Sequence, residues 1–390
     1  MYLSEYQAKE ILARYGVPVP EGGLARTPEE AEARARALSS EKVVVKAQIL
    51  AGGRGLAGGV KFAATPSGVR DEAEAMLGQR LVTEQTGPAG EIVERVYVEA
   101  AVDDRRSLYL ALVVDERTGE PTLLAAAEGG VAFEAKARSD PDMLHALGLA
   151  PDGGVEDGVL SGFLATLGLE RPAVDDVRRL VQAMVRAAFE TDALLVEINP
   201  LVIGPDGRAV AVDAKMVIDD NALYRHPEFE RMARDAHRDE YERVARENDI
   251  NFVKMQGDIG VVVNGAGLGL ATNDMLADAG GRPANFMDIR TTATSIQIAR
   301  GIDVLLGDPT VKVLLVNVHG GGMTVCDTVA EAISFAYARA PRKLPIVFRA
   351  AGQNAAWAAS IMKDRRLPFE RFDGMTQAVA RAVAIAGGAR

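Results

Sequence analysis

The sequence lacks the features that would place it among secreted, membrane-spanning or nucleic-acid-binding proteins. Its one cysteine, Cys326, excludes an intrachain disulfide framework and is typical of a reducing compartment. It has no run of about 18 apolar residues, and its N-terminus has no uninterrupted apolar stretch, so neither a membrane span nor a secretory signal is expected. The net charge of −11 disfavours nucleic acid and anionic membranes as partners. These absences predict a cytoplasmic protein, and the lack of a Cys and His cluster excludes a zinc site of the usual kind.

The composition is that of a globular chain with more than one domain. A length of 390 residues favours two or three domains, and 48% apolar with 25% charged residues argues against disorder. In the first half, Ser4 followed by Gln7 predicts a helix over residues 6–15, and Thr27 begins a second helix. The other elements expected there are strands over 42–49 and 92–102, a hairpin over 107–130 and an amphipathic helix over 174–192.

The pattern changes after a charged connecting segment. Residues 236–250 are predicted to link a domain over 1–235 to a domain over 251–390. In the second domain, strands and helical segments alternate, which predicts an α/β fold with a doubly wound parallel sheet, while the first domain has an α+β character. The predicted strands of the second domain are 259–265, 283–289, 312–318, 344–350 and 367–372.

The stretch LLVEINPLVIGPDGRAVAVDAK, residues 194–215, predicts a β-hairpin with polar groups inside an apolar element. A three-residue loop that ends at Gly207, with this glycine in the left-handed region, makes Gly204 oppose Arg208. Because side chains alternate between the two faces of a strand, this register decides which polar groups share a face.

In that register Asn199 opposes Asp213, and Glu197 opposes Lys215, all on one face. An amide oxygen beside a carboxylate suits Mg²⁺, which takes few protein ligands and completes its shell with water and phosphate oxygens. A solvated Asp and Asn beside a Glu–Lys pair is an alternative of equal weight from the hairpin alone.

A phosphate-binding partner for such a metal site is predicted earlier in the chain. Lys46 lies near the end of a predicted strand, just before the glycine-rich segment 51–59 that contains Arg54. Glycines let backbone N–H groups approach phosphate oxygens, although a mobile turn is the alternative and no P-loop motif is present. Glu99 could accept from an adenine amino group or a ribose hydroxyl, with a surface carboxylate as the alternative.

Six motifs are spread over nearly the whole chain. They are EYQAKEILARYGVPVP, VVKAQILAGGRGLAGGVK, AEGGV, EINPLV with VDAK, DDNALYRHPE and VNGAGLGLATNDML. Together they resemble the β subunit of succinate–CoA ligase (succinyl-CoA synthetase). The resemblance implies an ATP-grasp domain followed by a flavodoxin-like CoA-ligase domain. It also implies a partner α subunit that holds most of the CoA site and carries the phosphorylated histidine.

The reaction implied is acid + CoA + ATP ⇌ acyl-CoA + ADP + phosphate, with a phosphohistidine and an acyl phosphate as intermediates and no catalytic residue in this chain. Malate–CoA ligase, which shares the architecture, is the alternative within the family. Pro20 resembles the ATP-using members, so GTP is disfavoured. The four histidines that need no catalytic part are His145, His226, His237 and His319.

The resemblance also implies roles for single residues. The nucleotide positions are Lys46, Gly53, Arg54, Gly55, Glu99, Val102 and Ser107, and the Mg²⁺ ligands are Asn199 and Asp213. Asn264 matches a substrate-facing position shared with the α subunit. The loops that face the acid and the phosphohistidine contain Arg290, Gly321, Gly322 and Met323.

The chain departs from the family pattern in three places. Arg290, Thr291 and Thr292 replace a glycine triplet, and Val325 stands where arginine is common in a loop that is one residue longer. Ser107 replaces a glutamate that commonly contacts the nucleotide. Arg290 could pair bidentately with a second anionic group, which leads to the hypothesis of an altered acid substrate. Retention of succinate is the alternative.

Two other functional classes compete with this interpretation. The segment VNGAGLGLA follows a predicted strand, with Asp288 about 20 residues on, as in a dinucleotide-binding oxidoreductase. Leu270 stands where that fingerprint needs its third glycine, however, and the first half of the chain would stay unexplained. A non-catalytic subunit is suggested by Ser107 and the lost glycine triplet, but the retained metal and phosphate residues argue against it.

Overall fold

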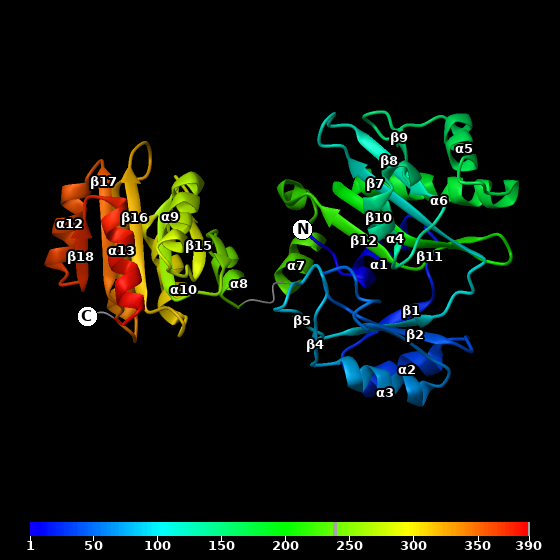
Figure 1. Ribbon diagram of the computed structural model, residues 1–390, viewed down its shortest axis with the longest axis horizontal. Helices are drawn as coiled ribbons and strands as arrows, with labels where there is room; N and C mark the ends of the chain where they lie inside the picture. Colours follow the sequence, from blue (N-terminus) through cyan, green and yellow to red (C-terminus); the bar gives the residue numbers. More distant parts are fainter. Residues whose placement is uncertain (237–239, 389–390) are drawn as a thin grey trace. The chain divides into compact units, whose positions relative to one another are not determined.

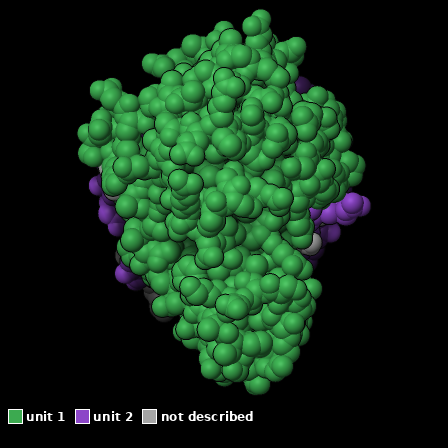
Figure 2. Space-filling view, turned by 90° about the vertical axis from the view of Figure 1, so that its right-hand side faces the viewer, with its two compact units in different colours: residues 1–230 green, residues 231–390 purple. Residues whose placement is uncertain are grey.

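The computed structural model describes residues 1–236 and 240–388, without the side chains of residues 134–135 and 233–236. The chain divides into two compact units, Met1–Glu230 and Arg231–Arg390, which Figure 2 shows in green and purple. His237 and part of the predicted linker lie outside the described residues, so the predicted domain limits stay predictions. No helix in the described ranges is long and apolar enough to cross a membrane.

The first unit combines helices with two main sheets (Figure 1). Its helices are α1 (Glu5–Arg14), α2 (Pro28–Ala37), α3 (Pro66–Met76), α4 (Phe133–Ser139), α5 (Asp157–Ala165), α6 (Arg171–Glu190) and α7 (Pro227–Ala236), which crosses the unit boundary, with 3₁₀ turns η1 (Pro141–Met143) and η2 (Asp220–Arg225). Its strands are β1 (Gly22–Ala25), β2 (Val43–Ala47), β3 (Val60–Ala63), β4 (Arg80–Leu81), β5 (Glu91–Ile92), β6 (Val96–Ala100), β7 (Arg106–Val114), β8 (Pro121–Ala126), β9 (His145–Gly148), β10 (Ala193–Ile203), β11 (Ala209–Ala211) and β12 (Ala214–Ile218).

Local signals explain how these elements begin. The capping box of Ser4 and Gln7 is formed at the start of α1, and the side chain of Thr27 accepts from the backbone N–H of Glu30 at the start of α2. The predicted hairpin over 107–130 is confirmed as β7 and β8. The prediction of one strand over 92–102 is wrong at its start, because Ile92 belongs to β5 and pairs with β4.

The two sheets of the first unit differ in size. One is antiparallel with the order β1-β6-β2-β3, and α2 and α3 pack their apolar residues on it. The other has the order β11-β10-β7-β8-β9, with β12 also paired to β10. The segment 101–105 runs from β6 in the first sheet to β7 in the second, so it connects the two sheets at one end.

The hairpin register is the one predicted from its turn. Leu201 pairs with Ala211, and Glu197 pairs with Lys215 through β12. Gly207 has a φ of +79°, in the left-handed region that the three-residue loop needs. Leu201 and Ala211, on the same face as the polar groups, are fully buried. The polar groups Glu197, Asn199, Asp213 and Lys215, which lie farther from the turn, are partly exposed.

The second unit is the doubly wound domain that the sequence predicts. Its helices are α8 (Glu240–Glu247), α9 (Ala266–Asp278), α10 (Ser295–Gly307), α11 (Cys326–Arg339), α12 (Ala355–Asp364) and α13 (Met375–Ala386). Its strands are β13 (Asn251–Lys254), β14 (Ile259–Asn264), β15 (Asn285–Ile289), β16 (Val313–Gly320), β17 (Ile346–Gly352) and β18 (Phe369–Phe372). All five predicted strands are confirmed, as β14 to β18.

The sheet of the second unit has the order β13-β15-β14-β16-β17-β18. The five predicted strands are parallel and follow the flavodoxin-like order 2-1-3-4-5, while β13 adds an antiparallel edge. Helices α10, α11 and α12 pack on one face of the sheet, and α9 and α13 pack on the other. The strand order reverses beside β14, which is where such sheets bind ligands.

Candidate functional site

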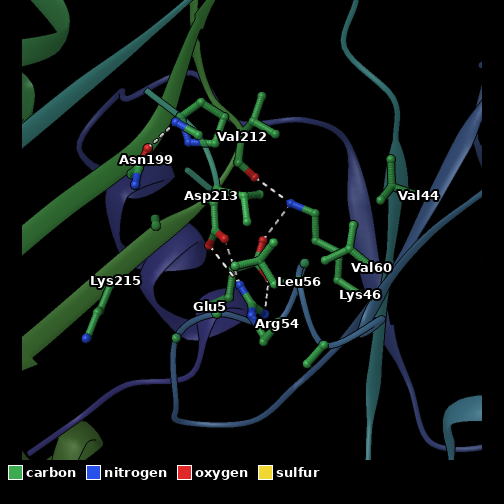
Figure 3. A pocket seen from close by; sticks show the side chains of 18 of the residues that line it. Glu5, Val44, Lys46, Arg54, Leu56, Val60, Asn199, Val212, Asp213 and Lys215 are labelled. Atoms are coloured by element: carbon green, nitrogen blue, oxygen red, sulfur yellow. Dashed lines mark hydrogen bonds and ion pairs between the residues drawn. The ribbon is translucent and has the colours of Figure 1, made fainter. Parts of the chain in front are cut away.

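The first unit holds a cavity of about 1350 Å³ that is lined by strands of both its sheets. Part of its lining is drawn in Figure 3. The cavity brings together every residue that the sequence assigned to the nucleotide and the metal. They are Lys46, Gly53, Arg54, Gly55, Glu99, Val102, Ser107, Asn199 and Asp213. Their separate roles stay predictions, but their assembly at one site is a property of the fold.

Lys46 and Arg54 both line the cavity, and both donate to the carboxylate of Glu5. Lys46 Nζ, on β2, donates to Glu5 Oε1 at 2.9 Å and to the Val212 carbonyl at 2.7 Å. Arg54 Nη1 donates to Glu5 Oε2 at 2.6 Å. Figure 3 shows both cations converging on Glu5, which projects from α1. A single helix near the N-terminus therefore fixes two cations that come from a strand and from the glycine-rich loop.

Glu99 is also part of this cluster. It is only 1% exposed, and its Oε2 accepts from Lys9 Nζ at 2.6 Å while its Oε1 lies 2.6 Å from Lys46 Nζ as an ion pair. The alternative of a surface carboxylate is therefore wrong. Because each of its oxygens is paired with a lysine, Glu99 holds Lys46 in place and balances its charge.

Sequence reasoning missed two members of the cluster, Glu5 and Lys9. Lys9 Nζ lies 2.8 Å from Glu5 Oε1, one turn away on α1. The side chains of Glu5 and Lys9 are 2% and 1% exposed. The signal for them was present in their spacing, because Glu5, Lys9 and the buried Leu12 stand at i, i+4 and i+7, on one face of α1. Charged residues on the buried face of a helix indicate buried partners, because an unpaired charge in a protein interior is costly.

The charges of the cluster are balanced. Three cations, Lys9, Lys46 and Arg54, meet three carboxylates, namely those of Glu5, Glu99 and Asp213. Burial alone would lower the pKa of Lys46, but the neighbouring carboxylates outweigh it and raise that pKa above its ordinary value of 10.5. Lys46 is therefore a permanent cation at neutral pH.

The glycine-rich loop points its arginine inward. Arg54 is 8% exposed, whereas Gly53 and Gly55 on either side of it are exposed. Gly53 has a φ of +77°, a conformation that a residue with a side chain rarely adopts. The loop closes with the Gly59 N–H donating to the Arg54 carbonyl at 2.8 Å. Its exposed glycines leave backbone accessible next to a buried cation.

Asn199 and Asp213 supply the oxygen atoms that the predicted metal site needs. The Asn199 N–H donates to the Asp213 carbonyl at 3.3 Å, so the two residues are opposed as predicted. Asn199 Oδ1 accepts from the Gly130 N–H at 2.6 Å, and Arg54 Nη2 donates to both Asp213 carboxylate oxygens at 2.8 and 2.9 Å. Each oxygen keeps a further lone pair, and the Asp213 side chain is 34% exposed.

This donor set fits a small, hard cation that needs few protein ligands. Within the described ranges, no group of three or more His, Cys, Asp or Glu side chains could hold a metal ion. One amide oxygen and one carboxylate match Mg²⁺, which takes the rest of its shell from water and phosphate oxygens. The residues present therefore fit Mg²⁺ better than zinc or a fully protein-bound calcium.

The predicted acid-binding residues lie in the second unit, at the carboxyl ends of the parallel strands. Asn264, at the end of β14, exchanges two hydrogen bonds of 2.8 Å with the backbone of His319 at the end of β16. Gly321, Gly322 and Met323 form the turn after β16, and the Met323 side chain is 72% exposed. Asn264 is therefore hydrogen-bonded to the end of β16, directly before this turn.

Arg290 extends toward the other side of the same edge. It follows β15, is 51% exposed, and its Nη2 donates to Asn251 Oδ1 on β13 at 3.4 Å. Its Nη1 lies 4.0 Å from Asp249 Oδ1. Asn264 pairs with Ile289, the residue before Arg290, so both residues lie at the carboxyl edge, but their side chains make hydrogen bonds to different neighbours.

Comparison with known proteins shows which families the two parts of the chain match. Residues 2–203 match the ATP-grasp domain family and residues 262–383 match the CoA-ligase family. The chain is 42% identical to a succinate–CoA ligase [ADP-forming] subunit beta from Acidiphilium cryptum (strain JF-5), over 98% of both chains. It is 40% identical to the protein of the same description from Ralstonia pickettii (strain 12J), over the full length of both. ATP citrate lyase from Methanothrix soehngenii, solved with citrate and coenzyme A, has the same fold, with a TM-score of 0.76 at 19% identity over 98% of each chain.

Proposed function

The chain belongs to the family of succinate–CoA ligase β subunits, and from this premise we propose that it is the nucleotide-using subunit of an ADP-forming acid–thiol ligase. The proposed reaction is succinate + CoA + ATP ⇌ succinyl-CoA + ADP + phosphate. The observation that carries the proposal is the cavity in which Lys46 and Arg54 face Asn199 and Asp213. Cations and hard oxygen ligands in one cavity suit a nucleoside triphosphate with its metal ion.

The proposed partner is an α subunit, in keeping with the description of the relatives as subunit beta. In this proposal the partner binds most of CoA and carries the histidine that receives the phosphoryl group. This chain supplies the nucleotide site in its first unit and part of the acid site, around Asn264 and the turn after β16, in its second unit.

Phosphoryl transfer depends mainly on position and charge, and this chain supplies both. Lys46 and Arg54 would bind phosphate oxygens, and Glu5 would hold the two cations in place before the nucleotide arrives. Asn199 and Asp213 would hold Mg²⁺, which supplies positive charge to the phosphate oxygens. The burial of the cluster strengthens each of these interactions relative to water.

The first prediction tests this function with γ-labelled ATP. In the purified complex of this chain with its partner subunit, label should pass from ATP to a histidine of the partner, and the phosphoprotein should lose its label when an acid and CoA are added. Mg²⁺ and ATP together should raise the melting temperature of the chain, and NAD should not. A complex that never becomes labelled would support the non-catalytic alternative, and stabilisation by NAD alone would support a dinucleotide-binding oxidoreductase.

A second candidate concerns the acid and is motivated by Arg290. This side chain is half exposed at the carboxyl end of β15 and makes one long hydrogen bond to Asn251 and a 4.0 Å ion pair with Asp249, so it is accessible to an anionic substrate. If it binds a second carboxylate, Arg290→Ala should raise the KM for a dicarboxylate by about tenfold and leave that for a monocarboxylate nearly unchanged. Arg300→Ala, at an exposed arginine on α10, is the matched control.

The assay compares succinate, malate, itaconate, glutarate and sulfinated analogues at saturating ATP and CoA. Equal or better activity with succinate than with every other acid would overturn the altered-substrate candidate and leave succinate as the substrate. An Arg290→Ala variant with unchanged preference would remove Arg290 from the acid site.

A further inference from the structure

The cavity of the first unit holds the buried ion cluster at one end, and apolar side chains with exposed charged groups at the other. Lys46 belongs to the ion cluster, and β2 leads back from it to Lys42, the residue before the strand, whose carbonyl accepts from the Ala101 N–H at 3.0 Å. At about 3.3 Å per residue, these ends are roughly 13 Å apart. Residues 101–104 of the connecting segment line the cavity at the far end, near Lys42, together with Val44 and Phe62.

A nucleoside triphosphate has the same polarity, with a polyanion at one end and a flat, weakly polar base at the other. If the phosphates lie at Lys46, the base and its ribose lie toward the connecting segment. Two carboxylates of that segment, Asp103 and Asp104, also line the cavity. Carboxylates would repel phosphate groups, so their position at the far end suits the uncharged hydroxyl groups of the ribose.

Asp104 is held in place by a contact with the strand that follows it. Ser107 Oγ donates to Asp104 Oδ2 at 3.3 Å, and Ser107 itself pairs with Val202 in the ladder of β7 and β10. The turn between them is fixed by the Arg105 N–H, which donates to the Ile203 carbonyl at 3.0 Å. The carboxylate therefore belongs to a defined part of the cavity wall, although it is solvent-exposed.

We propose that Asp104, oriented by Ser107, accepts hydrogen bonds from the ribose hydroxyls of the bound nucleotide. A carboxylate accepts and never donates when ionised, so it suits a vicinal diol with two O–H donors. Carboxylates bind ribose hydroxyls in this way at other nucleotide sites. The acceptor for the ribose then comes from residue 104, and Ser107 is a positioning residue. This inference rests on the proposed function, because it assumes that the cavity binds ATP.

The test compares ATP with 2′-deoxy-ATP and 3′-deoxy-ATP, by calorimetric titration of the full-length chain in the presence of Mg²⁺. The wild type should prefer ATP over at least one deoxy analogue by about tenfold, the low end of the range for hydrogen bonds to a charged group. Asp104→Asn should bind ATP about tenfold more weakly than the wild type does, and should bind the disfavoured deoxy analogue with the wild-type affinity. The variant therefore loses the preference for ATP over that analogue. Ser107→Ala should lose part of it.

The matched control is Asp71→Asn, at an exposed aspartate on α3 outside the cavity lining. It should keep both affinities. Asp104→Asn with the wild-type preference for ATP would overturn the assignment of the ribose acceptor while leaving the proposed function intact. A wild type that binds none of the three nucleotides would overturn the proposed function, and the ribose assignment with it.

Discussion

We expect the substitution Asp213→Asn to lower the rate of phosphoryl transfer from ATP by at least about 100-fold. Asparagine preserves the shape of the side chain but removes its negative charge. The variant therefore loses the carboxylate that is proposed to hold Mg²⁺ and whose two oxygens accept from Arg54 Nη2. The rate is measured as label transferred to the partner subunit over a series of Mg²⁺ concentrations, and the variant should also need more Mg²⁺ to reach half of its maximal rate.

Asp206→Asn is the matched control for this prediction. Asp206 lies at the tip of the same hairpin, is 62% exposed, and its Oδ1 accepts from the Arg208 N–H at 3.0 Å. Its replacement should leave both the rate and the Mg²⁺ dependence close to those of the wild type. If Asp213→Asn also keeps the wild-type rate and Mg²⁺ dependence, Asp213 has no part in the proposed metal site.

The parts of the fold that the sequence predicts are those set by local chemistry. The register of the hairpin follows from one turn, because Gly207 adopts the left-handed conformation and fixes which residues oppose each other. The alternation of strands and helices in the second unit follows from local periodicity, and the connection rules for parallel strands then restrict its topology. These signals lie within a few residues of the structure that they determine.

The missed features depend on contacts between distant residues. Strand β13 is four residues long and half exposed, so it has no strong local pattern and exists because β15 offers it an edge. The charged cluster joins Glu5, Lys46 and Glu99, which are brought together only when α1 meets β2 and β6. The family resemblance identified Lys46 and Glu99 as nucleotide residues, but it did not reveal that each of them is bound to α1.

The buried position of Glu5 leads to the second large prediction. We expect Glu5→Gln to lower the free energy of unfolding of the first unit by about 3–5 kcal/mol, the range for breaking a buried ion pair from one side. Glu5 is the carboxylate shared by Lys9, Lys46 and Arg54. The amide that replaces it carries no charge, so three buried cations are left with two carboxylates.

The measurement can separate the two units within one sample. The only tryptophan, Trp357, lies in α12 of the second unit, so its fluorescence follows that unit during urea unfolding, whereas circular dichroism follows both. The circular-dichroism component of the first unit should shift to lower urea in Glu5→Gln while the fluorescence transition stays in place. Glu10→Gln, at an exposed position on the same helix, should shift neither transition.

The pH dependence of the same variant distinguishes a charge effect from a packing effect. Burial would raise the pKa of Glu5, but Arg54, Lys46 and Lys9 outweigh it and hold that pKa well below its ordinary value of 4.5. A carboxyl group with a lowered pKa in the folded state stabilises the fold above its ordinary pKa, and this contribution is lost as the pH falls toward the lowered value. The wild-type first unit should therefore lose stability below about pH 4.5, and Glu5→Gln should lose less over the same range because it no longer carries this titrating group. Parallel acid profiles for the two proteins would show that the carboxylate charge of Glu5 does not stabilise the unit.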